Sequence, residues 1–231
     1  MFPPDQYQLL DFGNGRKLER FGPLVLDRPA PSADGCSREA PSLWRSADLR
    51  YDRESGTQGR WSGRTELGDD WTIEHPPFAL RLIPNEFGHV GVFPEQAENW
   101  DWIANRSRQA GSADGSPLKI LHLFAYTGAA TLAAASSNAE VVHVDGARNV
   151  VAKARRNAEL SGLSGASIRW ITEDAGKFVA RELKRGNRYD AVILDPPSYG
   201  RGPKGQEWKI GRDLPPLLDG IAELTRSDPR Y

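Results

Sequence analysis

The chain has 231 residues, of which 39% are hydrophobic and 26% are charged, with a net charge of −1 and a mean hydropathy of −0.57. No apolar run approaches the roughly 20 residues of a membrane span, and no signal-peptide pattern opens the chain, so we expect a cytoplasmic protein without a membrane partner. The single cysteine, Cys36, excludes an intramolecular disulfide and a CxxC metal site, and the four histidines lack metal-ligand spacing, so no metal is expected.

Residues 1–93 are predicted to form a small β-rich domain. Two short segments, 9–12 and 16–21, flank Gly13-Asn14-Gly15, a pattern typical of a β-hairpin. Further strands are expected at 24–26, near Trp61, at 71–73 and at 78–82. The segment 88–93 is expected to close this domain.

Residues 94–117 are predicted to connect this domain to a second one. Pro94 suits the first position of a helix, because its missing N–H is not needed there, and the helix is expected to run to about Ser107. The segment 110–117 is rich in Gly, Ala and Ser, which is typical of a linker.

The segment 118–231 alternates strand and helix patterns. Strands are expected at 118–124, 140–145, 167–172 and 190–194, and helices at 128–137, 147–161, 175–186 and 213–226. Strands that alternate with helices of this length form right-handed βαβ units around a parallel sheet. This domain is therefore predicted to be α/β and Rossmann-like.

The connection after the first of these strands reads Phe124-Ala125-Tyr126-Thr127-Gly128, and the second strand ends in Asp145 followed by Gly146. An acidic side chain at that strand end suits a ribose, since a carboxylate accepts hydrogen bonds from both hydroxyls. A dinucleotide would need more glycines in the first turn. S-adenosylmethionine has a ribose but no phosphates, so it fits the single-glycine turn.

Four pieces of the chain resemble class I S-adenosylmethionine-dependent methyltransferases, in particular the branch that acts on large-subunit ribosomal RNA. They are Gly88-His89-Val90-Gly91-Val92-Phe93-Pro94-Glu95-Gln96, the segment Phe124–Gly128 with Asp145, Glu173-Asp174-Ala175, and Asp195-Pro196-Pro197. The resemblance covers about residues 70–231. It implies a methyl transfer to an RNA base.

The resemblance also implies residue roles. The residues expected at the cofactor are Gln96, Phe124, Ala125, Tyr126, Thr127, Gly128, Asp145, Gly146, Asp174, Ala175, Asp195, Pro196 and Pro197. Asp195 is the expected catalytic residue, and the substrate is expected at Tyr199, Arg201 and Lys204.

Several positions have alternative interpretations. Asp145 and Asp174 suit the N-caps of the helices that follow them, and Thr131 suits a buried helix position. Ser198 stands where related enzymes carry a stacking aromatic or a nucleophilic cysteine, so no nucleophile is identified. Ala97 and Trp100 replace arginines that are usual in this branch, which argues against phosphate contacts by that segment.

A class I sheet has seven strands in the order 3-2-1-4-5-7-6, and only strands 3-2-1-4 are expected here. The fifth would begin near Tyr231, so a truncated domain with an unpaired edge at 190–194 is expected. A protein or small-molecule methyltransferase, or an inactive cofactor-binding fragment, are the alternative functions. The net charge of −1 counts mildly against RNA, whereas the basic residues after Asp195 favour it.

Overall fold

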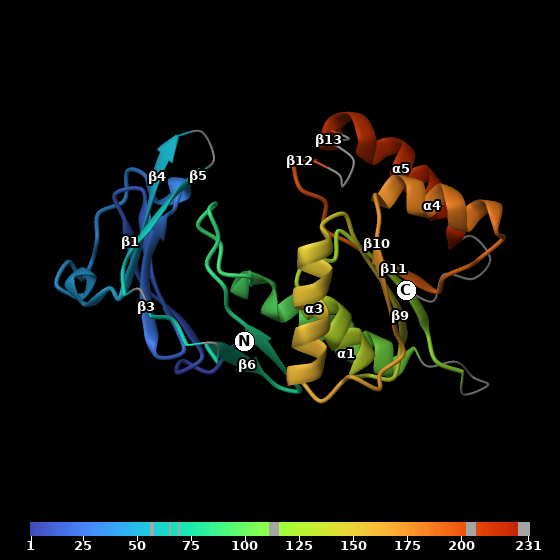
Figure 1. The fold of residues 1–231 in the computed structure, drawn as a ribbon, viewed down its shortest axis with the longest axis horizontal. Helices are drawn as coiled ribbons and strands as arrows, with labels where there is room; N and C mark the ends of the chain where they lie inside the picture. Colours follow the sequence, from blue (N-terminus) through green and yellow to red (C-terminus); the bar gives the residue numbers. More distant parts are fainter. Residues whose placement is uncertain (56–57, 65, 69, 111–115, 202–206, 226–231) are drawn as a thin grey trace. The chain divides into compact units, whose positions relative to one another are not determined.

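The computed structural model describes residues 1–55, 58–64, 66–68, 70–110, 116–201 and 207–225 (Figure 1). The chain divides into two compact units, Met1–Ala97 and Glu98–Tyr231, which are described separately. Within the described ranges, no helix is both long enough and apolar enough to cross a membrane.

The first unit contains a five-stranded sheet in the order β1-β2-β3-β4-β5. Its strands are β1 (Tyr7–Gly13), β2 (Arg16–Phe21), β3 (Leu24–Pro29), β4 (Leu49–Ser55) and β5 (Gln58–Gly63). Only the β3–β4 pair is parallel. A separate hairpin joins β6 (Thr72–His75) to β7 (Phe78–Arg81), and two 3₁₀ helices, η1 (Pro31–Ala33) and η2 (Leu43–Ser46), lie between β3 and β4.

The predicted first hairpin is present. Asn14 and Gly15 form its two-residue loop, with φ angles of 52° and 69°. Asn-Gly tolerates two successive left-handed residues, and this turn matches the twist of the flanking strands. The sequence did not predict β4, because its Leu-Arg-Tyr-Asp-Arg-Glu-Ser lacks a clear apolar alternation.

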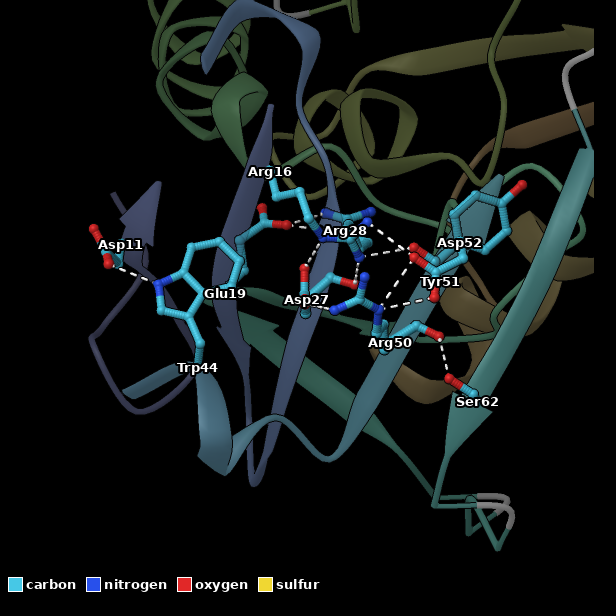
Figure 2. Close-up of polar contacts among 10 residues, drawn as sticks. All are labelled: Asp11, Arg16, Glu19, Asp27, Arg28, Trp44, Arg50, Tyr51, Asp52 and Ser62. Atoms are coloured by element: carbon cyan, nitrogen blue, oxygen red, sulfur yellow. Dashed lines mark hydrogen bonds and ion pairs between the residues drawn. The ribbon is translucent and has the colours of Figure 1, made fainter. Parts of the chain in front are cut away.

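Charged residues of β2, β3 and β4 form a network of ion pairs that explains the composition of β4 (Figure 2). Asp27 is almost fully buried and contacts both Arg16 and Arg50. Arg50 also pairs with Asp52 at 2.8 Å, which lowers the pKa of the Asp52 carboxyl. The strand therefore joins the sheet through its backbone ladder, its ion pairs and two buried side chains on one face, Leu49 and Tyr51.

The second unit holds a four-stranded parallel sheet in the order β10-β9-β8-β11. Its elements are α1 (Ala97–Gln109), β8 (Lys119–Leu123), α2 (Ala129–Ala135), β9 (Glu140–Asp145), α3 (Arg148–Leu160), β10 (Ile168–Thr172), α4 (Ala175–Lys184), β11 (Ala191–Leu194) and α5 (Ile210–Leu224). The short helix η3 (Pro94–Gln96) precedes α1. In chain order the sheet is 3-2-1-4, which confirms the predicted partial methyltransferase topology.

Successive residues of each strand point to opposite faces of this sheet, and each face has its own core. Leu121, Leu123 and Val144 pack with α4 and α5 on one face. Ile120 and Val141 pack with α2 on the other. Figure 1 shows α4 and α5 side by side. Because both faces of the central strands β8 and β9 are covered, their mainly apolar character is expected.

The end of the second unit differs from the expectation. A hairpin that was not predicted, β12 (Tyr199–Arg201) with β13 (Glu207–Lys209), follows the proline motif. Helix α5 then begins at Ile210 instead of residue 213, since the Asp213 carboxylate accepts the backbone N–H of Lys209 at 2.7 Å and stabilises an earlier first turn.

Candidate functional site

The register of the sheet brings three predicted site residues to one edge. Strand β8 lies between β9 and β11, and the pairing places Phe124, Asp145 and Asp195 at neighbouring strand ends. Adjacent strands lie about 4.8 Å apart, so the backbones of the two aspartates flank the turn after β8 at a separation of roughly 10 Å. The carboxyl edge of the sheet therefore carries two acidic side chains with a turn between them.

The turn itself has an unusual backbone. Phe124, Tyr126 and Gly128 have φ angles of 54°, 49° and 91°. Left-handed conformations are costly for non-glycine residues, by about 1 to 3 kcal/mol each, and persist only where the surroundings enforce them. Two such residues in one five-residue turn are more than a simple chain reversal requires, and they are typical of functional sites.

Neighbouring elements enforce this conformation. The backbone N–H of Tyr126 donates to Oδ2 of Asp145 at 2.9 Å, and that of Ala125 donates to the backbone of β9 at 3.1 Å. On the other side, Nδ2 of the buried Asn157 donates to the carbonyl of Thr127 at 2.9 Å. Strand β9 and helix α3 thus hold the turn from both sides.

Gly128 is required by close packing as well as by its backbone angle. A Cβ atom at this position would lie 3.1 Å from the Cβ of Ala154 on α3. The single glycine of the turn therefore lets α3 approach the start of α2.

Asp145 is the central acidic group of the site. Its Oδ1 accepts the N–H of Ala147 at 2.9 Å, while its Oδ2 binds Tyr126. Burial raises the pKa of this carboxyl, and the two backbone hydrogen bonds oppose that shift. The alternative interpretation of Asp145 as a helix N-cap is wrong, because α3 begins at Arg148 with Ala147 as its N-cap.

Asp174 does cap a helix. Its Oδ1 accepts the N–H of Lys177 at 3.0 Å at the start of α4, and Ala175 is the first residue of that helix. A carboxylate has about four acceptor sites, so Asp174 can cap its helix, and Asp145 can accept its two backbone N–H groups, with capacity left for a ligand.

The proline motif presents an exposed carboxylate. Asp195 follows β11 directly and is exposed, and within the described ranges no group donates a hydrogen bond to it. The carbonyl of Pro197 accepts from Nε1 of Trp208 at 2.7 Å, and that of Ser198 accepts from the backbone of Ile210 at 3.1 Å. The motif is thus held by its carbonyls while its acidic side chain faces solvent.

Two of the predicted substrate residues, Tyr199 and Arg201, lie on β12 of the hairpin that follows. Tyr199 is 48% exposed, and its hydroxyl donates to Oε1 of Glu207 at 3.0 Å. Arg201 ends β12, and Lys204 lies outside the described residues.

Gly146 belongs to the bend between β9 and α3, beside Asp145. Gln96 ends η3 in the first unit, and its role at the cofactor stays a prediction.

Sequence reasoning missed a buried polar network beneath the turn. The hydroxyl of Thr131 lies 2.7 Å from Nδ1 of His122 and 2.9 Å from Nδ1 of His143. Burial lowers the pKa of His122 to about 3 and that of His143 well below its ordinary value, so both rings are neutral at physiological pH. The interpretation of Thr131 as a buried helix residue is confirmed.

The donor set of this edge fits S-adenosylmethionine. The Asp145 carboxylate suits the two ribose hydroxyls, and Asp174 with the N–H of Ala175 suits the adenine amine and a ring nitrogen. The turn from Phe124 to Gly128 offers backbone groups for the zwitterionic methionine. It has no glycine-rich cradle of the kind that a pyrophosphate needs.

Comparison with known proteins agrees with this chemistry. The family described as S-adenosylmethionine-dependent methyltransferase matches residues 47–225. The ribosomal RNA large subunit methyltransferase I of Aeromonas hydrophila is 32% identical over 163 residues, which are 68% of this chain and 39% of that protein. The ribosomal RNA large subunit methyltransferase K of Neisseria meningitidis is 27% identical over 78% of this chain and 49% of its own length.

Solved structures show the same architecture. A crystal structure of a SAM-dependent methyltransferase from Agrobacterium tumefaciens has a TM-score of 0.90 at 39% identity, and covers 97% of this chain and 70% of that one. A methyltransferase structure from Streptococcus mutans has a TM-score of 0.72 at 19% identity, and covers 95% of this chain and 58% of that one. The chain spans less than half the length of the two ribosomal RNA methyltransferases above.

Proposed function

Because the chain belongs to the S-adenosylmethionine-dependent methyltransferases, we propose that it methylates a base of large-subunit ribosomal RNA. The observation that carries this proposal is the alignment of Asp145, the Phe124–Gly128 turn and Asp195 along one sheet edge. A cofactor held by the first two would present its methyl group toward Asp195. The names of the two curated relatives support RNA as the substrate class.

The protein's own part in such a reaction is mainly positioning. S-adenosylmethionine supplies an already activated methyl group when it is bound. The turn and Asp145 fix the orientation of the nucleoside and its amino acid. Aligning two reactants in this way can contribute most of the rate enhancement of a transfer reaction.

Asp195 would act on the target base. Its carboxylate is exposed and can accept a hydrogen bond from an N–H of the base, or take the proton that the target atom loses on methylation. Tyr199 offers an exposed ring four residues after Asp195, and base–aromatic stacking contributes about 1 to 3 kcal/mol per base.

A labelled-methyl assay tests this proposal. The purified chain is incubated with S-adenosylmethionine carrying a tritiated methyl group and with an unmodified transcript of large-subunit ribosomal RNA. We expect label that is sensitive to ribonuclease and is recovered as one methylated nucleoside. Transfer should weaken as salt rises, because phosphate contacts release counterions.

Two parallel samples decide between the alternatives. A small-subunit transcript and a protein extract treated with ribonuclease replace the large-subunit RNA. Label in the protein extract alone would show a protein methyltransferase. Cofactor binding by calorimetry without transfer to any sample would show a cofactor-binding fragment.

A further inference from the structure

Trp208 connects the two halves of the candidate site. It lies in the middle of β13, the second strand of the hairpin that follows the proline motif. Its side chain is half-buried and packs at the margin of the core formed by β8, α4 and α5. Neither the composition nor the spacing of the sequence distinguished it from the other tryptophans.

One contact of Trp208 is to the proline motif. Its Nε1 donates to the carbonyl of Pro197 at 2.7 Å. The neighbouring carbonyl of Ser198 is bound by the backbone N–H of Ile210 at 3.1 Å. The indole N–H is therefore the side-chain contribution to a pair of hydrogen bonds that fix the chain just after Asp195.

The other contact is to the turn Phe124–Gly128, called the cofactor turn below. The indole ring packs on Phe124 with ring centroids 4.8 Å apart and an interplanar angle of 57°. Phe124 is one of the two left-handed non-glycine residues of that turn. A ring packed against a strained residue restricts the alternative backbone and rotamer states that would relieve the strain.

We propose that Trp208 is a positioning residue that sets the placement of the Asp195–Ser198 segment relative to the cofactor turn. It acts through Pro197 on one side and through Phe124 on the other. This inference rests on the proposed function, because the distance it fixes is the one between the methyl donor and the target base. A misplacement of about 1 Å at such a site can lower the rate of transfer by two orders of magnitude.

The test separates the two contacts by substitution. Trp208→Phe keeps an aromatic ring for Phe124 but removes the N–H donor, whereas Trp208→Leu removes both. For Trp208→Phe we expect cofactor affinity, measured by calorimetry with S-adenosylhomocysteine, to change less than twofold. Single-turnover transfer to the ribosomal RNA transcript should fall at least about tenfold. Trp208→Leu should weaken cofactor binding as well.

Hydrogen exchange provides a readout that does not depend on the substrate. The amides of residues 198–201 and of Ile210 should exchange roughly two- to tenfold faster in Trp208→Phe, since one hydrogen bond contributes a factor of that order. The control is Trp102→Phe, the same substitution at a residue of α1 that is 57% exposed. It should leave these amides, cofactor affinity and transfer unchanged.

The outcomes are distinguishable. Unchanged exchange in Trp208→Phe, or losses of affinity and transfer in equal proportion, would overturn the role of Trp208. If the unsubstituted chain binds cofactor but labels no RNA, the proposed substrate is wrong, and the exchange measurement still decides whether Trp208 holds the proline motif.

Discussion

Asp145→Ala is the most informative substitution in the site. It removes the acceptor of two backbone N–H groups, those of Tyr126 and Ala147, each bound at 2.9 Å. Hydrogen bonds to a charged acceptor contribute about 1.5 to 3 kcal/mol each. Burial of this carboxylate offsets part of that gain and raises its pKa, so each bond should contribute no more than the low end of this range. The free energy of unfolding should therefore fall by about 2 to 3 kcal/mol for the two bonds together.

The same substitution should weaken cofactor binding. Loss of one charge-assisted hydrogen bond to a ribose hydroxyl costs at least about 1.4 kcal/mol, which corresponds to a tenfold increase in Kd. Calorimetry with S-adenosylhomocysteine measures the affinity, and denaturant unfolding measures the stability. Both should be run well below the melting temperature of the variant, so that the folded fraction stays constant.

Asp190→Ala is the matched control. The Asp190 carboxylate accepts the backbone N–H of Lys119 at 2.8 Å, at the opposite end of the same sheet. Its loss should lower stability and leave cofactor affinity within twofold. If Asp145→Ala also bound within twofold, Asp145 would only hold the turn. If both variants bound equally weakly, the loss would reflect general destabilisation and our assignment would be refuted.

Three further outcomes are expected. Asp195→Asn should lower the rate of single-turnover methyl transfer at least about a hundredfold, while cofactor affinity changes less than threefold. If the rate and the affinity fell in equal proportion, Asp195 would be a binding residue only. The depressed pKa values of His122 and His143 mean that the unfolded chain takes up protons below about pH 6.5 while the folded chain does not. The free energy of unfolding should therefore be at its maximum above that pH and should fall below it by up to about 1.4 kcal/mol per pH unit for each histidine. In urea titrations, His122→Gln should lose less of this free energy as the pH is lowered. Among the described strands, β11 pairs only with β8, which leaves its other edge without a strand partner. The protein should therefore self-associate through this edge of β11. A monomer in sedimentation velocity at all concentrations would contradict that expectation.

The sequence predicted the second unit well. Mainly apolar strand segments of four to six residues, separated by helices, are typical of strands covered on both faces, and all four strands occur in the predicted order. The Asn14-Gly15 hairpin was equally predictable, because its left-handed backbone restricts the residues that can occupy it. Both patterns depend only on residues that are close together in the chain, so they can be recognised without knowledge of the fold.

The side-chain partners were not predictable. Asp145 and Asp174 looked alike in the sequence, since each follows a strand and precedes a helix. In the structure Asp174 caps its helix, whereas Asp145 holds the turn that follows β8. The difference arises because β9 lies beside β8, which brings the N–H of Tyr126 within reach of one carboxylate, and β10 lies at the edge of the sheet, away from that turn.

The amino-acid sequence by itself determined the α/β class of the second unit, the cofactor family and the positions of the acidic residues at the strand ends. It could do so because hydrophobic periodicity and turn chemistry depend on neighbouring residues. Only the tertiary structure decided that Trp208 contacts both Pro197 and Phe124, and that Thr131 bridges His122 and His143. These contacts join residues between 9 and 84 positions apart, and the packing of the helices on the sheet, rather than any local pattern, brings them together.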